Sequence, residues 1–263
     1  MSKLRIAIIS DLHIGRTARS KELCPHDDYK GSNEASLQGF SEFIKKERIE
    51  PHYLIIPGDI TDRGDPLEFK LASETITRIG NILNIQEEKL LFVPGNHDQN
   101  WSALSQNGED HSGIEAAHMY QSLEQDDLIF RNILRRSSHC MLSENCQAIW
   151  KFNDLFVVGY NSSWHLRKES ENYYGLVKQN SLDWLEEQLM QIDQLEPRIK
   201  IFLVHHHPIQ YSNHIPDQPD FSIMTNAENL MKLLSRGFNF EVQHLTVAWY
   251  SAPSFRRTPQ TGF

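Results

Sequence analysis

The chain has 263 residues, which is enough for one large domain or two small ones. Its 26 Lys and Arg against 35 Asp and Glu give a formal net charge of −9. This balance argues against binding nucleic acid or an anionic membrane through bulk charge. No apolar run approaches the roughly 18 residues that span a bilayer. Three cysteines without CxxC spacing argue against a disulfide framework, and the apolar run at residues 4–9 is too short for a signal peptide. We therefore expect a cytoplasmic, globular protein.

Hydrophobic spacing predicts alternating strands and helices along the chain. The first half is expected to read βαβαβ, and the second half a hairpin followed by helix, strand, helix and a final strand. The predicted strands cover residues 4–10, 52–57, 89–93, 147–151, 155–160, 199–204 and 240–247. The predicted helices cover residues 34–47, a segment that begins at 65–66, residues 181–192, and residues 227–234 with Gly237 closing the last. Such a pattern is typical of a layered α/β domain, with a long polar loop at residues 99–122.

Side chains able to bind a metal follow four of these strands. The segments are Asp11-Leu12-His13, Gly58-Asp59, Gly95-Asn96-His97-Asp98 and His205-His206-His207. Taken singly, each has a structural explanation; a Gly-Asp after a strand, for example, is more often a turn than a ligand. Taken together, the four segments favour one site, because a parallel sheet gathers its carboxyl-end loops along one rim.

The residue types indicate the chemistry of this site. Carboxylate, amide oxygen and imidazole, without thiolate, suit Mn, Fe or Zn in a catalytic site rather than a structural Cys-zinc site. A carboxylate shared by two divalent ions can help clamp a phosphoryl group and activate a bound water. The sequence therefore predicts hydrolysis of a phosphate ester.

In content and order, the four motifs resemble those of the calcineurin-like metallophosphoesterase family, over about residues 4–208. The chain is most similar to the cyclic-nucleotide-phosphodiesterase-like branch. The resemblance implies a four-layer α-β-β-α sandwich that holds two divalent ions between the strand ends. It also implies a small phosphate-ester substrate, such as a nucleotide.

The resemblance assigns a role to each motif residue. Asp11 and His13 would hold the first ion, Asp59 would bridge, and the second ion would be held by Asn96 and His205. Of the three consecutive histidines, His205 fits the family position best, ahead of His206 and His207. His97 would protonate the leaving oxygen or stabilise the transition state, and Asp98 would hold the His97 imidazole in the useful tautomer.

The resemblance breaks near the C-terminus. The family places a Gly-His-x-His motif after the strand predicted at 240–247, and here residues 246–253 read Thr-Val-Ala-Trp-Tyr-Ser-Ala-Pro. These residues can be encoded so that the frame one base later reads Leu-Leu-His-Gly-Thr-Gln-His. We therefore expect a single domain over residues 1–263, truncated or frameshifted after about residue 245, with incomplete C-terminal strands. Each ion would lose one imidazole, and the histidines that could substitute are His206, His207, His214 and His244.

Several interpretations stay open at this level. The leading one is a phosphomonoesterase or phosphodiesterase; the alternatives are an inactive binding module and a fragment of a longer protein. Asp62 and Arg63 could contact a phosphate, although turn chemistry explains them equally well. His111 and His118 lie in the 99–122 loop, where a solvated surface is favoured over a substrate contact. Trp164-His165 is similarly undecided, and the sequence does not specify an oligomeric state.

Overall fold

The computed structural model describes residues 4–15, 30–64, 66–98, 139–143, 146–163, 174–191, 199–209 and 223–238. Several expectations lie outside these residues: the loop at 99–122, Trp164-His165, His214, and the strand at 240–247 with His244 and the altered motif.

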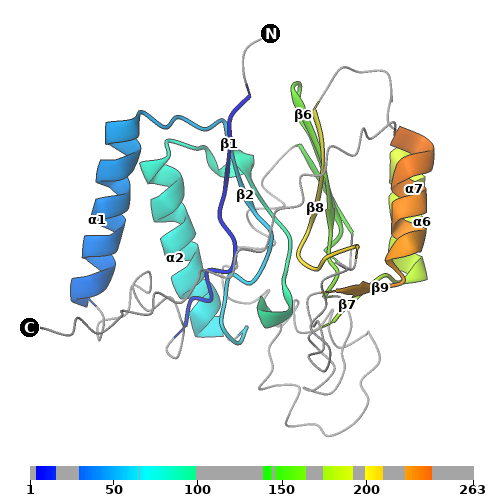
Figure 1. Cartoon of the computed structure of the whole chain (residues 1–263), viewed down its shortest axis with the longest axis horizontal. Coiled ribbons are helices and arrows are strands. Elements are labelled where there is room, and N and C mark those ends of the chain that lie inside the picture. The colour runs from blue at the N-terminus through cyan, green and yellow to red at the C-terminus, as the bar shows by residue number, and fades with distance from the viewer. Residues whose placement is uncertain are drawn as a thin grey trace, which may run out of the picture.

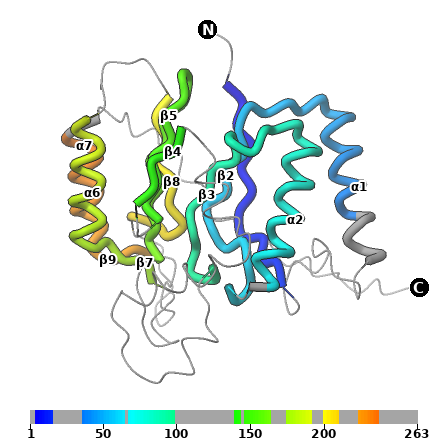
Figure 2. The backbone as a smooth tube through the Cα atoms, turned by 180° about the vertical axis from the view of Figure 1, so that it is seen from behind, coloured from blue at the N-terminus to red at the C-terminus, as the bar shows by residue number. Residues whose placement is uncertain are grey.

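The described elements form four layers in the order helix, sheet, sheet, helix. Helices α1 (Lys30–Glu47) and α2 (Pro66–Ile82) cover one sheet, and α6 (Gln179–Met190) and α7 (Ala227–Phe238) cover the other (Figure 1). The same order is visible from behind, with the two sheets facing each other in the middle (Figure 2). This confirms the predicted α/β sandwich.

The first sheet consists of three parallel strands in the order β1-β2-β3. These are β1 (Ile6–Ile8), β2 (Tyr53–Ile56) and β3 (Leu90–Phe92), which follows the short 3-10 helix η3 (Glu87–Lys89). Every residue of β2 is buried, as expected of a central parallel strand covered on both faces. The parallel order puts the carboxyl ends of all three strands at one edge.

The second sheet has the order β4-β5-β6-β8. Its strands are β4 (Cys140–Leu142), β5 (Ala148–Lys151), β6 (Leu155–Tyr160) and β8 (Ile199–Val204). Strands β5 and β6 form the predicted antiparallel hairpin, and β8 pairs parallel to β6 over its whole length. A small parallel sheet of β7 (Gly175–Leu176) and β9 (Met224–Thr225) was not predicted, and neither was β4.

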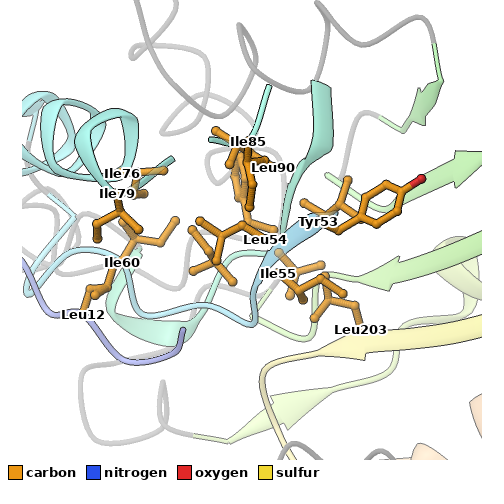
Figure 3. Close-up of a cluster of buried hydrophobic side chains, with 14 of the residues drawn as sticks. Leu12, Tyr53, Leu54, Ile55, Ile60, Ile76, Ile79, Ile85, Leu90 and Leu203 are labelled. Atoms are coloured by element: carbon orange, nitrogen blue, oxygen red, sulfur yellow. The ribbon is translucent and has the colours of Figure 1, made fainter. Parts of the chain in front are cut away.

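Strand β6 shows how the core is divided. Leu155 and Val157 belong to the cluster that includes the first sheet and its helices α1 and α2, whereas Phe156 and Val158 pack with α6 and α7. This alternation is the two-residue period of a strand buried on both faces. Figure 3 shows part of the first cluster, which reaches from Ile76 and Ile79 of α2 to the second sheet, where Leu203 lies beside Ile55 of β2.

One polar contact also links the two halves of the sandwich. The Tyr53 hydroxyl of β2 donates to Asp154 Oδ1 in the β5–β6 turn at 2.6 Å. A short bond to a carboxylate is among the stronger hydrogen bonds in proteins, so this contact fixes how the two sheets meet.

Several element boundaries differ from the sequence prediction, by up to four residues. Helix α1 begins at Lys30 rather than at residue 34. Helix α7 continues through Gly237 to Phe238, so this glycine does not close it as expected. Strand β1 ends at Ile8 instead of residue 10, because the chain turns into left-handed backbone at Asp11.

Candidate metal centre

The site is built on the loops that follow β1, β2, β3 and β8. The first two loops run side by side, joined by backbone hydrogen bonds from Asp11 N to Gly58 O at 3.3 Å, His13 N to Asp59 O at 2.9 Å and Ile14 N to Ile60 O at 2.9 Å. Parallel pairing thus continues past the strand ends and carries Asp11, His13 and Asp59 into one place.

The backbone at these positions is unusual. Seven described residues other than glycine have positive φ, and three of them are predicted ligands: Asp11 at 57°, His13 at 43° and Asp59 at 51°. Left-handed backbone of this kind is sparsely populated by side-chain-bearing residues, and such strain clusters at functional sites. Asp and His adopt this conformation more often than most residues, and its concentration on three ligand positions indicates that it serves to place their side chains.

Two glycines let the loops approach closely. Gly58 has a φ of 105°, and a Cβ there would lie 2.7 Å from His205 Nδ1 and 2.8 Å from Gly95 N. A Cβ on Gly95 would lie 2.5 Å from Asp59 N and closer still to Asp59 Oδ1. Neither position has room for a side chain, so both glycines are required by packing around Asp59.

The first ligand group consists of Asp11, His13 and Asp59. His13 Nε2 lies 3.5 Å from Asp59 Oδ2 and 3.8 Å from Asp11 Oδ1. Burial lowers the pKa of His13 more than Asp59 raises it, which favours the neutral imidazole that metals bind. Burial likewise raises the pKa of Asp11, against the opposing hydrogen bond from Ser10. The buried Oδ1 atom of Asp11 has no hydrogen-bond partner within the described part of the chain, as expected of an oxygen that faces a cation.

The second ligand group consists of Asn96, His205 and again Asp59. His205 Nδ1 lies 2.9 Å from the Pro57 carbonyl oxygen, which only accepts, so Nδ1 carries a proton. His205 Nε2 then lies 3.1 Å from Asn96 Oδ1 and 3.4 Å from Asp59 Oδ1. In a neutral ring Nε2 is an acceptor, like Asn96 Oδ1 and Asp59 Oδ1. Three acceptor atoms that converge in this way are stabilised by a cation between them. The residues present therefore fit a metal ion.

Asp59 lies between the two groups. Its Oδ2 faces His13 and its Oδ1 faces His205, and the whole residue is buried. The backbone N–H of His97 also donates to Asp59 Oδ1 at 3.0 Å, which fixes the carboxylate. The structure thus brings together all five residues that the sequence suggested as ligands: Asp11, His13, Asp59, Asn96 and His205.

His97 lies beside this centre, but Asp98 does not hold its imidazole as the sequence suggested. His97 Nδ1 donates to the backbone carbonyl oxygen of Asp62 at 2.7 Å. The Asp98 carboxylate points inward and accepts from Gly95 N at 2.9 Å, Thr61 N at 2.8 Å and Thr61 Oγ1 at 3.0 Å. Burial and the nearby Asp59 raise the pKa of Asp98 to about 6. Asp98 therefore joins the loops after β2 and β3, and the carbonyl of Asp62 orients the His97 ring instead.

The other two histidines of the 205–207 run have different surroundings. His206 is buried, its Nδ1 lies 2.7 Å from Ser162 Oγ, and its ring packs against Gly175. His207 bonds through its backbone carbonyl to Met224 N at 2.9 Å, beside the small sheet. Of the three, His205 is the one placed against Asp59.

Sequence reasoning left Asp62 open and missed Glu68. Ligand atoms of His13, Asp62 and His97 lie within 4.8 Å of one another, with His13 Nδ1 4.0 Å from Asp62 Oδ1. Glu68 is a buried carboxylate in the first turn of α2. Its only signal in the sequence was an acidic residue at the start of an apolar helix.

Comparison with known proteins identifies the family. The sequence profile of the calcineurin-like phosphoesterases matches residues 4–243. The chain therefore belongs to this family of metal-dependent phosphoesterases, which confirms the resemblance drawn from its motifs.

The other comparisons add less. No curated protein matches the chain. Among solved structures, a purple acid phosphatase isolated from yellow lupin (Lupinus luteus) seeds is similar, with a TM-score of 0.43 and 15% identity over 80% of this chain. The match covers 31% of the lupin chain, so the present chain spans about a third of that length. Among the helices that the structure describes, none has the length and apolarity to cross a membrane.

Proposed function

We propose that the protein hydrolyses phosphomonoester or phosphodiester bonds of a small substrate, such as a nucleotide, with two divalent ions of Mn, Fe or Zn. The observation that carries the proposal is the position of the Asp59 carboxylate. Its Oδ2 lies 3.5 Å from His13 Nε2, and its Oδ1 lies 3.4 Å from His205 Nε2. One oxygen directed to each ligand group is what a bridging carboxylate requires.

In this proposal each ion has three protein ligands. Asp11, His13 and Asp59 would hold one ion, and Asp59, Asn96 and His205 the other. Three protein ligands with an open position suffice in many catalytic metal sites. When bound, the ions would polarise the phosphoryl group and lower the pKa of the attacking water.

His97 is the proposed proton donor. Its Nδ1 is committed to the Asp62 carbonyl at 2.7 Å, so Nε2 is the nitrogen that exchanges a proton with the substrate. The donor is the imidazolium, which carries a proton on each nitrogen. As the bond between phosphorus and the leaving oxygen breaks, the Nε2 proton moves to that oxygen and the neutral ring keeps its proton on Nδ1. Asp98 is the second residue of the proposed catalytic pair, after His97. It supports the proton transfer indirectly, because its bonds from Thr61 hold the loop that carries His97.

The test uses the full chain, stripped with a chelator and reloaded with Mn²⁺. Hydrolysis of bis(p-nitrophenyl) phosphate and p-nitrophenyl phosphate is measured together with the metal content per chain. Asp59→Asn is expected to lose both hydrolysis and bound metal, whereas Asp183→Asn, an exposed change on α6, is expected to keep both. Wild-type metal content in Asp59→Asn would overturn the bridging role. Metal-loaded wild-type protein without hydrolysis of either ester would favour a binding module instead.

A second part of the proposal concerns the chain as a whole. We place residues 1–263 in one domain that lacks one family imidazole for each ion, and we place the protein in the cytoplasm, where Cys140 and Cys146 stay reduced. A variant with Gly-His-x-His inserted after residue 245 is expected to bind Mn²⁺ more tightly and to turn over faster. Equal affinity and turnover in the two proteins would show that no ligand is missing.

A further inference from the structure

We propose that Glu68 is a positioning residue for His97 and acts through the peptide group that joins Asp62 to Arg63. The inference rests on the proposed function, because it concerns the imidazole that we assign as proton donor. Glu68 itself is not expected to touch either the substrate or an ion.

The two hydrogen bonds that define this arrangement use the same peptide group. The N–H of Arg63 donates to Glu68 Oε2 at 2.7 Å, and the carbonyl oxygen of Asp62 accepts from His97 Nδ1 at 2.7 Å. The C=O of residue 62 and the N–H of residue 63 belong to one planar unit. A rotation of that plane would therefore break both bonds together, so the Glu68 carboxylate fixes the direction in which the Asp62 carbonyl points.

The surroundings of Glu68 indicate a carboxylate held in place for a reason. Only 4% of the residue is exposed, and carboxylates are seldom buried this deeply unless they have partners. A Cβ on Gly15 would lie 2.9 Å from both Glu68 Cδ and Asp62 Cβ. Glu68 thus sits where the loop after β1 meets the loop after β2, and Gly15 leaves room for it.

Helix capping alone does not account for the contact. Helix α2 begins at Pro66, so Arg63 lies outside the helix and the bond from its N–H anchors the loop. The helix N-terminus does help to stabilise a negative charge at Glu68. An ionised acceptor gives a shorter and stronger bond than a neutral one, and bonds in a chain polarise each other. The carboxylate therefore strengthens the Asp62 carbonyl as the acceptor for His97.

The chemical consequence is control of the His97 tautomer. A carbonyl acceptor held in a fixed direction keeps a proton on Nδ1, so Nε2 is the nitrogen that exchanges a proton with the substrate. A buried carboxylate that orients an imidazole directly is well known from hydrolytic triads. In this chain one peptide group is inserted between the carboxylate and the imidazole.

The kinetic test compares Glu68→Gln with Glu74→Gln, an exposed change on the same helix. Both variants are loaded with Mn²⁺ and assayed on the p-nitrophenyl and the phenyl ester of the same phosphate. In Glu68→Gln we expect unchanged Mn²⁺ content and KM, and a fall in kcat of roughly 10–100-fold, the usual effect of a supporting partner. The fall should be larger on the phenyl ester, whose leaving oxygen needs the proton more. An equal fall on both esters would overturn the proposal, since a purely structural defect acts on both alike.

A second measurement is independent of turnover. Protein labelled with ¹⁵N-histidine, without metal, is examined by NMR, and the His97 imidazole is assigned by its loss in His97→Asn. Wild type and Glu74→Gln should show the Nδ1-protonated tautomer, and Glu68→Gln a mixture. A wild-type tautomer in Glu68→Gln would contradict the proposal even if the protein never hydrolyses an ester, so this failure is separate from failure of the proposed function. If Glu68→Gln does not fold, hydrogen exchange of the Arg63 amide is measured in the wild-type protein. Exchange as fast as that of an exposed amide would refute the bond to Glu68.

Discussion

Substituting Gly95 by Ala should weaken metal binding and lower the rate of hydrolysis without unfolding the protein. The added Cβ would lie 2.5 Å from Asp59 N and 2.9 Å from Asp59 Cγ, and closer still to Oδ1. Since carbon and oxygen or nitrogen atoms rest at roughly 3.5 Å, the loop after β3 or Asp59 must shift by about 1 Å. Overpacking of this kind costs about 1–3 kcal/mol of stability. A 1 Å misplacement in a catalytic site can lower the rate about 100-fold.

The matched control is Gly39→Ala. Gly39 is exposed in α1, and a Cβ there meets nothing within 4 Å. Alanine is favoured over glycine inside a helix by about 0.5–1 kcal/mol, so this variant should be slightly more stable than wild type. Urea unfolding, Mn²⁺ titration and ester hydrolysis are measured on all three proteins. If Gly95→Ala bound Mn²⁺ with wild-type affinity, the close packing around Asp59 would have no functional role.

Three further changes test separate parts of the account. His97→Asn should keep its metal and lose roughly 10²–10⁴-fold in turnover, the contribution of a positioned acid; loss of metal in ICP analysis would make His97 a ligand. Tyr53→Phe should lower the free energy of unfolding by about 1.5–3 kcal/mol, because it removes the bond to Asp154 that links the sheets. Burial and this bond raise the pKa of Tyr53, so the wild type should lose stability as the pH rises above about 10, and Tyr53→Phe should lose less in parallel alkaline melts. Asp11→Asn should make the metal-free protein more stable at pH 7. Burial raises the pKa of Asp11, so ionisation of this carboxyl opposes folding above its unfolded-state pKa. Thermal melts with chelator that showed a lower melting temperature for Asp11→Asn would contradict this.

The fold was largely predictable from hydrophobic period. Strand β2 is a continuous apolar run because both of its faces are covered. The turn of the β5–β6 hairpin is flanked by two largely apolar runs, which are the paired strands. The two-residue strands β7 and β9 are too short to show any period. Helix α7 passes through Gly237 because packing of its apolar face outweighs the propensity of one glycine for a helix end.

The site was predictable as a set of strand ends but not as a network. Position after a strand predicted Asp59 and His205 as neighbours, although β2 and β8 belong to different sheets and it is the packing of the two sheets that brings them together. The His97 imidazole is oriented by a backbone carbonyl oxygen, and a sequence does not show the direction in which a carbonyl points. For the same reason Glu68, whose partner is the backbone N–H of Arg63, could not be recognised.

The claim that Asp59 joins two ions is tested most directly by electron paramagnetic resonance of the protein loaded with two equivalents of Mn²⁺. A carboxylate shared by two ions couples their spins, so we expect an exchange-coupled spectrum in wild type that is absent from Asp59→Asn. A spectrum of two isolated Mn²⁺ ions in the wild-type protein, or saturation at one equivalent, would contradict it.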